Sequence, residues 1–443
     1  MNWDDAAIQR WLEPLAGRGG EIAEVFGETL TELALEWRDG AVTEARVRRE
    51  EGTSARRRAG GAEQFVFVAG TDDAAVREAV RALRAETRSE PLPIRAARPP
   101  GSADAPVEIF PDADRWARRI GAILGRHAPR HAFTFRIRET ERRVVADGQR
   151  SASSARRLLS LEGRFTAASR AGDERRPFAF HAPVSESAAD ELKTLLAAAA
   201  APRDRPVPAP AGETDVILAG GSAAVFFHEV LGHPLEADAE ASPLRGLPDA
   251  RVTVSDLDVT DDPRRLDLFG GYESDDEGTA PRAARLLASG LLGARLTDRA
   301  HAIASGSTGH ARRAGPSDPP LPRGANVVVA AGSADADEML RRLGNGIWIE
   351  EFAGGSVEIA SGSFRLRFPR ARRVRRGRFA DELSGGVLAG ELLPALGAIE
   401  PVLGREVRAC RSFGWCARGG QVVPVGGAAP EVLLRRLTVR PDP

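Results

Sequence analysis

Hydrophobic and polar residues alternate in several stretches of the first two hundred positions, as they do in β-strands that bury one face. The hydrophobic side chains of residues 31–37 fall on the same side of an extended chain. The Asp39-Gly40 pair that follows is typical of a hairpin turn. The same alternation predicts further strands at residues 42–47, 65–68 and 133–137.

Two other segments of this region show helical spacing instead. Residues 73–84 follow an Asp cap and are predicted to form a helix. In the second segment, Trp116, Ile120 and Leu124 lie on one helical stripe. Strands and helices together predict an N-terminal α+β domain over residues 1–205.

A proline-rich segment at residues 201–212 interrupts both patterns. It cannot continue the helix that is predicted to end near Ala200, and its prolines favour an extended spacer. We therefore predict a linker over residues 206–213 and a second domain over residues 214–443.

Short strands dominate the second domain. A strand at residues 215–219 leads through a Gly220-Gly221 turn into a helix, for which Ser222 is a candidate N-cap. Further strands are predicted at residues 251–254, 290–297, 326–329, 356–359 and 364–368, with a helix at residues 334–343. The predicted fold class is α+β, with a C-terminal, largely antiparallel β domain or partial barrel that carries the helix after Ser222.

Composition and charge narrow the class of partner. The chain has 443 residues, of which 42% are hydrophobic, so it can bury a large core. Its formal net charge of −1 gives no electrostatic reason to expect nucleic acid or a membrane surface as a partner. The basic run at residues 370–378 lacks interleaved aromatic residues and is predicted to be a hairpin tip.

The first residues, the apolar runs and the cysteines of the chain indicate the cellular compartment in which it is expected. Residues 1–5 are acidic where a secretory signal needs a basic region, and the longest apolar run, residues 195–202, is too short to cross a bilayer. Two cysteines cannot build a disulfide framework. We expect a cytoplasmic protein without a membrane segment.

The most informative motif is His228-Glu229 followed by His233. Two imidazoles that bracket a carboxylate are what a catalytic zinc ion needs, but five residues of α-helix rotate by roughly 500° and leave the rings about 140° apart. A π-type turn of about 4.4 residues would bring them within roughly 50°. Gly232 gives the backbone the necessary freedom, and Pro234 predicts that the helix ends or kinks at His233.

A catalytic zinc ion takes three protein ligands and keeps one position open. The candidates for the third ligand are Cys416, Glu236, Asp238, His301 and His310, and a Cys thiolate is the best zinc donor among them. Zinc lowers the pKa of a bound water molecule, whose proton Glu229 would accept without binding the metal. Glu236 and Asp238 would otherwise orient the imidazoles through ring N–H bonds or be plain surface acids. Cys410 matches no motif and is predicted to lie in the core.

Residues 228–238 resemble the metallopeptidase motif of the TldD/PmbA family. Three further blocks resemble that family in the same order: residues 275–279 (DDEGT), residues 346–362 and residues 415–426, which contain Cys416. Within the family, chains called TldD carry the two histidines and the glutamate, and those called PmbA lack them. This chain resembles the TldD side.

The resemblance implies a zinc metallopeptidase that acts on unfolded or small peptides, with Cys416 as the third ligand. It also implies that the site lies inside a dimer, either of two copies or with a PmbA-like relative, which admits only extended chains that pair with sheet edges. The glycine-rich loop at residues 306–313 is either a connector or a substrate contact through Gly309 and Arg312. The acidic Asp275 to Glu277 segment would bind a metal, face solvent, or have a structural or substrate role.

The chain departs from the family pattern at three positions. Pro234 stands where Gly is usual, which bears on the placement of His233. Trp415 and Ala417 stand where Thr and Gly are usual, which bears on the width of the cleft. The alternative function is a non-catalytic partner or scaffold with a structural or vestigial zinc site, and the intact ligands and base argue against it.

Overall fold

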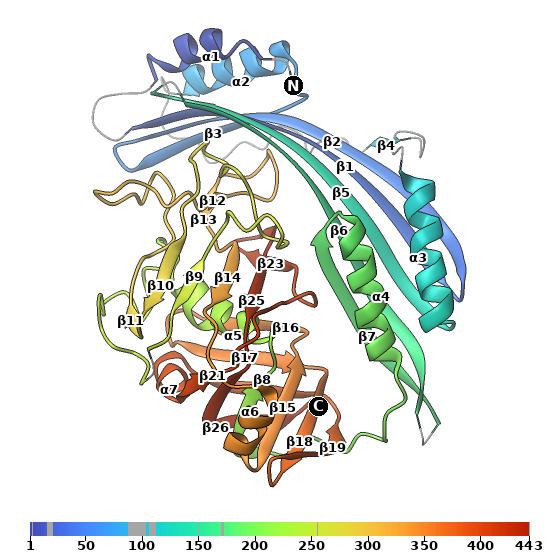
Figure 1. Ribbon diagram of the computed structural model, residues 1–443. Helices are drawn as coiled ribbons and strands as arrows, with labels where there is room; N and C mark the ends of the chain where they lie inside the picture. The colour runs from blue at the N-terminus through green and yellow to red at the C-terminus, as the bar shows by residue number, and fades with distance from the viewer. Residues whose placement is uncertain are drawn as a thin grey trace.

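The computed structural model describes residues 1–442 except residues 2, 16–20, 87–102, 106–111, 149, 170, 171 and 255. The fold is α+β and rich in sheet, and a long curved sheet from the N-terminal half arches over the C-terminal half (Figure 1). The helices are α1 (Asp5–Leu12), α2 (Asp73–Glu86), α3 (Ala113–His127), α4 (Glu186–Ala200), α5 (Ala223–Phe227), α6 (Ala336–Leu343) and α7 (Leu392–Gly397).

The N-terminal sheet is antiparallel, in the order β3-β2-β1-β5-β6-β7, with the short β4 also paired to β2. Its strands are β1 (Ile22–Arg38), β2 (Ala41–Ala59), β3 (Ala62–Ala69), β4 (Ala103–Ala105), β5 (His131–Ala146), β6 (Arg150–Ser169) and β7 (Gly172–Pro183). The predicted strands and the turn at Asp39-Gly40 are present, but β1, β2 and β5 are much longer than the alternation indicated, and β6 and β7 were not predicted.

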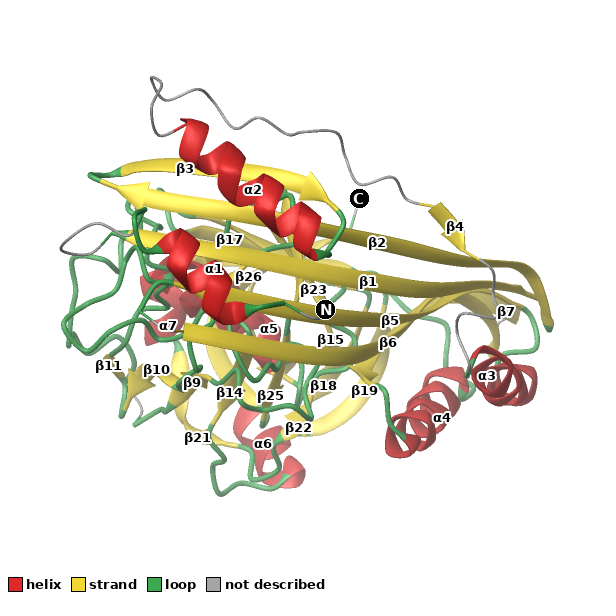
Figure 2. Ribbon diagram, turned by 90° about the horizontal axis from the view of Figure 1, so that it is seen from above, coloured by secondary structure: helices red, strands yellow, loops and turns green. Residues whose placement is uncertain are grey.

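The two faces of this sheet have different partners. Hydrophobic residues such as Leu33 and Ile137 pack against α3 and α4, and Val25 and Val145 pack near α1 and α2. The four helices therefore cover one face, with α1 and α2 toward one end and α3 and α4 toward the other (Figures 1 and 2). The opposite face carries polar side chains toward the C-terminal half.

The C-terminal half contains two larger sheets and two small hairpins. The six-stranded sheet has the order β11-β10-β9-β14-β25-β22, from β9 (Val259–Asp261), β10 (Ala284–Ala288), β11 (Leu291–Leu292), β14 (Asn326–Val329), β22 (Arg408–Ala409) and β25 (Gly426–Ala429). The hairpins join β12 (Ala311–Arg312) to β13 (Leu321–Pro322) and β23 (Trp415–Arg418) to β24 (Gln421–Pro424).

The nine-stranded sheet has the order β16-β17-β20-β26-β8-β15-β18-β19, and β21 also pairs with β26. Its strands are β8 (Gly212–Leu218), β15 (Gly346–Glu351), β16 (Gly354–Glu358), β17 (Ser363–Phe368), β18 (Arg370–Arg375), β19 (Arg378–Leu383), β20 (Gly386–Glu391), β21 (Ile399–Leu403) and β26 (Val432–Pro441). The basic run forms the β18–β19 hairpin, as predicted, and its arginines pair with acids such as Glu382 and Asp381.

Several predictions for the C-terminal half need correction. Most strand pairs are antiparallel, but β8 with β15 and β14 with β25 are parallel, and the described strands form no closed barrel. Residues 251–254 are not a strand, because only Arg251 pairs with a strand, in a single bridge to Leu291 of β11, and Val254 is exposed. Only Leu291–Leu292 of residues 290–297 is a strand. Ser222 precedes α5 but makes no capping bond, since its hydroxyl donates to Glu350 O.

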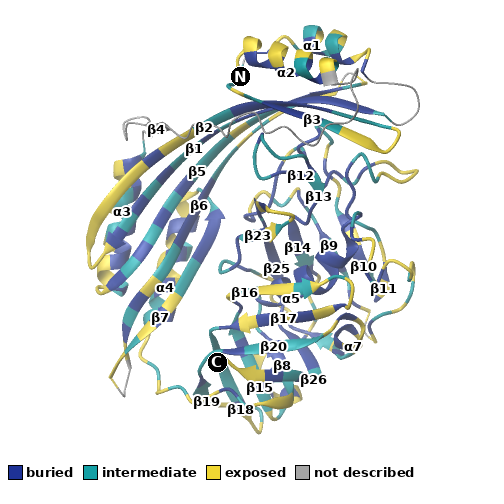
Figure 3. Cartoon of the chain, turned by 180° about the vertical axis from the view of Figure 1, so that it is seen from behind, coloured by how far each residue is buried: buried dark blue, intermediate teal, exposed yellow. Residues whose placement is uncertain are grey.

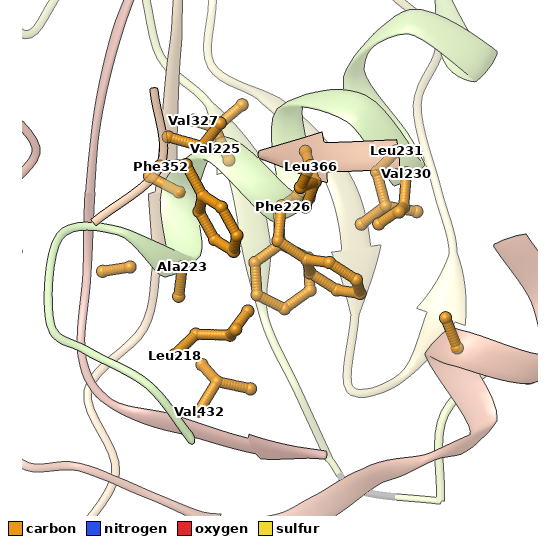
Figure 4. Packing of buried hydrophobic residues seen from close by; sticks show 14 of the residues in the cluster. Leu218, Ala223, Val225, Phe226, Val230, Leu231, Val327, Phe352, Leu366 and Val432 are labelled. Atoms are coloured by element: carbon orange, nitrogen blue, oxygen red, sulfur yellow. The ribbon is translucent and has the colours of Figure 1, made fainter. Parts of the chain in front are cut away.

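Helix α5 lies at the centre of the C-terminal core. Its five residues, AAVFF, are all buried. Phe226 and Val225 pack among Leu218, Leu366 and Val327 from the surrounding strands (Figure 4). Burial on all sides fixes the direction in which the chain leaves α5, and therefore the position of His228 that follows.

Buried ion pairs join the two halves. Glu24 of β1 accepts from Arg313, Arg56 of β2 pairs with Glu277, and Arg142 of β5 pairs with Asp276. The acidic segment is thus buried against the N-terminal sheet and does not face solvent. Figure 3 shows that the strands of the N-terminal sheet are largely buried where they cross above the C-terminal half. None of the helices among the described residues is long and apolar enough to cross a membrane.

The segment predicted as a linker packs against the C-terminal sheet. Val207, inside the predicted linker, bridges to Leu383 of β19, and Arg203, just before it, pairs with Glu350 and Glu382. The domain boundaries at residues 206–213 stay a prediction.

Candidate metal centre

The chain widens into one π-helical turn directly after α5. This turn spans His228–Gly232 and is closed by the His233 amide, which donates to the His228 carbonyl five residues earlier. A 3-10 turn, His233–Leu235, follows with Pro234 inside it. The spacing of the two histidines predicts this widening, and the structure confirms it. The imidazole rings consequently lie next to each other, edge to face, with centroids 4.6 Å apart.

Cys416 joins the two histidines from the β23–β24 hairpin. Its Sγ lies 3.4 Å from His228 Nε2 and 3.2 Å from His233 Nε2. All three side chains are buried, and their donor atoms lie within 4.8 Å of one another. Among the described residues, this is the group of His, Cys, Asp and Glu that could hold a metal ion.

The donor set fits a metal ion of the catalytic type. Metal–ligand bonds of about 2.0–2.3 Å in a tetrahedron place neighbouring donors roughly 3.5 Å apart, close to the observed separations. Two imidazoles and one thiolate also leave one tetrahedral position for water or substrate. His228, His233 and Cys416 are therefore able to hold the ion.

The local charges favour a thiolate at Cys416 but not a neutral His233. Burial opposes ionisation of Cys416, but the charges of His233 and His228 outweigh it and hold the pKa of the thiol well below its usual value. Burial lowers the pKa of His233, but Glu236 and Cys416 raise it well above its usual value, so the ring must lose a proton when a metal ion binds. Burial raises the pKa of Glu229 above its usual range, against the opposing effect of the two histidines. A carboxyl with a raised pKa is a better proton acceptor, which suits a general base.

Glu236 supports His233 from behind. One of its carboxylate oxygens, Oε2, lies 3.1 Å from His233 Nδ1, and the other accepts from the Gly324 amide. Arg418 pairs with both Glu236 and Asp238. Glu236 therefore contacts a ligand ring directly, whereas Asp238 acts only on Arg418.

A cleft of about 550 Å³ opens beside these residues. Glu229, His233 and Cys416 lie in its wall, as do the glycines of β16. Residues Glu162, Ala179 and His181 of the N-terminal sheet form the opposite wall. The donor cluster is thus open to a substrate on one side.

Comparison with known families and proteins agrees with this geometry. The family model described as the PmbA/TldA metallopeptidase C-terminal domain matches residues 211–441, just over half of the chain. The chain belongs to the TldD/PmbA family.

Curated TldD/PmbA proteins are similar to this chain over about half of its length. A protein named metalloprotease from Methanothermobacter thermautotrophicus is 31% identical over 237 residues, 52% of this chain and 51% of that protein. The zinc metalloprotease TldD homolog of Saccharolobus solfataricus is 28% identical over 237 residues, 52% of each chain. The aligned chain thus spans about half the length of these curated relatives.

The fold as a whole recurs in a solved structure. TldE from Thermococcus kodakarensis has a TM-score of 0.74 and 15% identity over 98% of this chain and 99% of its own. At that identity the likeness shows the fold alone, including the long N-terminal sheet.

The other candidate residues from the sequence lie outside the cluster of His228, His233 and Cys416. His301 bonds to Asp298, and His310 to Asp261. Arg312 is buried and donates to the carbonyls of Gly324 and Pro424, and Gly309, with a φ of +74°, accepts from Tyr272; neither lines the cleft. Cys410 is buried in the core, as predicted.

Sequence reasoning missed several residues of the TldD/PmbA site. Arg323 donates to Cys416, Arg418 pairs with Glu236, and His181 packs in the opposite wall. Nearly all of the 62 basic residues are arginines, so no single arginine stands out in the sequence. Only Arg418 could have been suspected from the sequence, because it lies two residues after Cys416.

Proposed function

We propose that this protein is a zinc-dependent metallopeptidase that hydrolyses peptide bonds in unfolded or small peptides. The observation that carries the proposal is the convergence of two imidazoles and one thiol beside Glu229 in an open cleft. The names of the relatives, metalloprotease and zinc metalloprotease TldD homolog, support both the reaction and the metal.

His228, His233 and Cys416 would hold the zinc ion, and Glu229 would move the proton. A bound zinc ion supplies Lewis acidity that polarises a peptide carbonyl and makes water a nucleophile near neutral pH. Glu229 accepts the proton from the attacking water and then donates it to the leaving amine. Glu236 keeps the His233 ring in its orientation through the bond at Nδ1.

Strand β16 is the proposed docking edge for the substrate. It lies at the end of the nine-stranded sheet and pairs only with β17 among the described strands. A Cβ at Gly355 would lie 3.0 Å from Glu229 Cγ, so the backbone of β16 passes directly beside the base. An extended peptide that adds to this edge would present its backbone to Glu229, whereas a folded protein would not fit.

The organisation of the molecule follows from the same proposal. We infer an N-terminal domain that forms one wall of the cleft and a C-terminal domain that holds the metal. A second copy of this chain, or a PmbA-like relative, would enclose the cleft and restrict entry to extended chains. Both cysteines are free, which suits a reducing compartment such as the cytoplasm.

Replacing Glu229 with glutamine separates metal binding from catalysis. We expect Glu229→Gln to retain one zinc ion per chain and to lose turnover of an unfolded test peptide by about 100-fold or more, because it removes the general base. Zinc content and kcat/KM are measured on the same preparations. A variant that cleaves the peptide as fast as the wild type contradicts the mechanism, and a wild type that binds zinc but cleaves no peptide favours a scaffold.

A further inference from the structure

Arg323 is a fully buried arginine that contacts a proposed metal ligand. Its side chain is 0% exposed and follows strand β13. One terminal nitrogen, Nη2, donates to the Cys416 carbonyl at 2.8 Å and lies 3.1 Å from Cys416 Sγ. The other, Nη1, reaches the carbonyls of Arg418 and Gln421, both at 3.4 Å. The guanidinium therefore bonds to both strands of the hairpin, to Cys416 and Arg418 of β23 and to Gln421 of β24.

The next residue connects the same segment to the second ligand. The Gly324 amide donates to Glu236 Oε1 at 3.2 Å, and Arg323 Nε lies 3.8 Å from the same oxygen. The other oxygen of Glu236 contacts His233 Nδ1. Two consecutive residues thus reach Cys416 directly and His233 through Glu236.

The backbone at Gly324 lies close to His228, so a side chain there would be tightly packed. A Cβ there would lie 3.2 Å from Asp261 Oδ2 and 3.4 Å from His228 Cε1. The backbone after Arg323 is consequently pressed against the ring of the remaining ligand. The segment that carries Arg323 therefore contacts the surroundings of all three proposed ligands.

We propose that Arg323 is the positioning residue of the metal centre, which holds Cys416 in place and tunes its sulfur. The inference rests on the metal site of the proposed function. A charged donor that bonds to a ligand sulfur draws electron density away from it, which leaves the metal ion a stronger Lewis acid. The planar guanidinium reaches the sulfur and the carbonyl of the same residue together, which the single charge of lysine cannot do.

The test uses full-length protein loaded with Zn²⁺ or Co²⁺. Arg323→Met removes the donor, and Arg323→Lys keeps the charge without the planar group. Changes around metal ligands typically weaken metal binding by roughly 10- to 100-fold, and we expect Arg323→Met to fall in that range. We expect the sulfur-to-cobalt charge-transfer band to move to longer wavelength in both variants, with the smaller change in Arg323→Lys.

Arg176→Met is the matched control. Arg176 is equally buried but donates to the carbonyls of Ala199 and Ala201, away from the metal ligands. We expect this control to lose stability and to keep the zinc affinity and the cobalt band of the wild type. If Arg323→Met does not fold, the band and the affinity of Arg323→Lys decide the question.

Three results would overturn the inference. Zinc affinity and a cobalt band that stay unchanged when Arg323 is replaced refute its role while the metal site stands. Equal losses in Arg176→Met show that the effect is only destabilisation. A wild type that binds neither Zn²⁺ nor Co²⁺, or that binds Co²⁺ without a sulfur-to-cobalt band, refutes the inference together with the proposed function.

Discussion

Cys416 brings the third donor to the histidine pair from a hairpin 183 residues beyond His233. Its sulfur is held between the two rings, with the Arg323 guanidinium as a further neighbour. The site therefore depends at the residue scale on long-range packing as much as on the local motif. A change at Cys416 tests that dependence without disturbing the helix that carries the histidines.

We expect Cys416→Ser to bind zinc more weakly than the wild type by more than the roughly 10- to 100-fold that changes around metal ligands cost, because it removes a ligand. Zinc affinity is measured by competition with a chelator. Cys410→Ser is the matched control, since Cys410 is also buried but its sulfur lies near Ser412 and not near the histidines. Unchanged zinc binding in Cys416→Ser would assign the third ligand to another residue.

The local geometry of the motif was predictable, whereas its distant partners were not. The five-residue separation of His228 and His233 cannot place both rings on one face of a regular helix, so it demands a wider turn. Nothing in the spacing of residues selects Cys416 among the candidate third ligands; the family resemblance does. Arg323 is hidden among many arginines and becomes visible only through its contacts.

At the scale of elements, the alternation of hydrophobic and polar residues predicted several strands that bury one face, but it did not predict how long they are. Strand β2 was predicted only at residues 42–47, yet it pairs with β1 over residues 41–58, because residues 48–58 are mostly polar or charged and show no hydrophobic alternation. Residues 251–254 alternate, yet only Arg251 pairs, in one bridge to Leu291, because a local pattern does not supply a partner for the whole segment. Parallel pairing of β8 with β15 was likewise invisible in the sequence.

The contact between β1 and the loop after β12 depends on Arg313. This side chain is 0% exposed, donates to Glu24 at 2.9 Å and lies 4.1 Å from the centroid of the Phe26 ring. Removing one partner of a buried ion pair costs about 3–5 kcal/mol, because the other charge stays buried.

We therefore expect Arg313→Met to lower the free energy of unfolding by about 3–5 kcal/mol in urea titrations. Arg342→Met is the control, because Arg342 forms an exposed helical pair with Glu338 and such pairs contribute only about 0.3–0.5 kcal/mol. Equal effects of the two substitutions would mean that the buried pair does not hold the halves together.

At the scale of the whole molecule, the N-terminal sheet closes one side of the cleft and contacts the segment that leads to Cys416. The His181 backbone amide donates to the Arg411 carbonyl, and the ring packs where a Cβ at Gly414 would lie only 2.3 Å away. The hydrogen bond from His181 lowers the pKa of Glu162, and burial raises it. The hydrogen bond has the larger effect, so the pKa of Glu162 lies below its usual value. Residues of both halves therefore pack together in the wall of the cleft.

We expect His181→Ala to speed amide hydrogen exchange at residues 411–418 by roughly 5- to 10-fold, since losing a buried hydrogen bond costs about 1–1.4 kcal/mol. The His181 ring reaches both the Arg411 carbonyl and Glu162, and both contacts vanish in the variant. His301→Ala serves as the control, because its ring bonds to Asp298 and lies outside the cleft. Exchange that stays unchanged in His181→Ala would show that the N-terminal sheet does not steady this segment.

The zinc content of purified protein, compared between the wild type and His228→Ala by elemental analysis, tests the metal centre most directly. We expect close to one zinc ion per chain in the wild type and a large loss in His228→Ala, because that variant keeps only two of the three donors. A wild type that binds no zinc even when zinc is added, or a His228→Ala variant that retains it fully, would contradict the proposed metallopeptidase site.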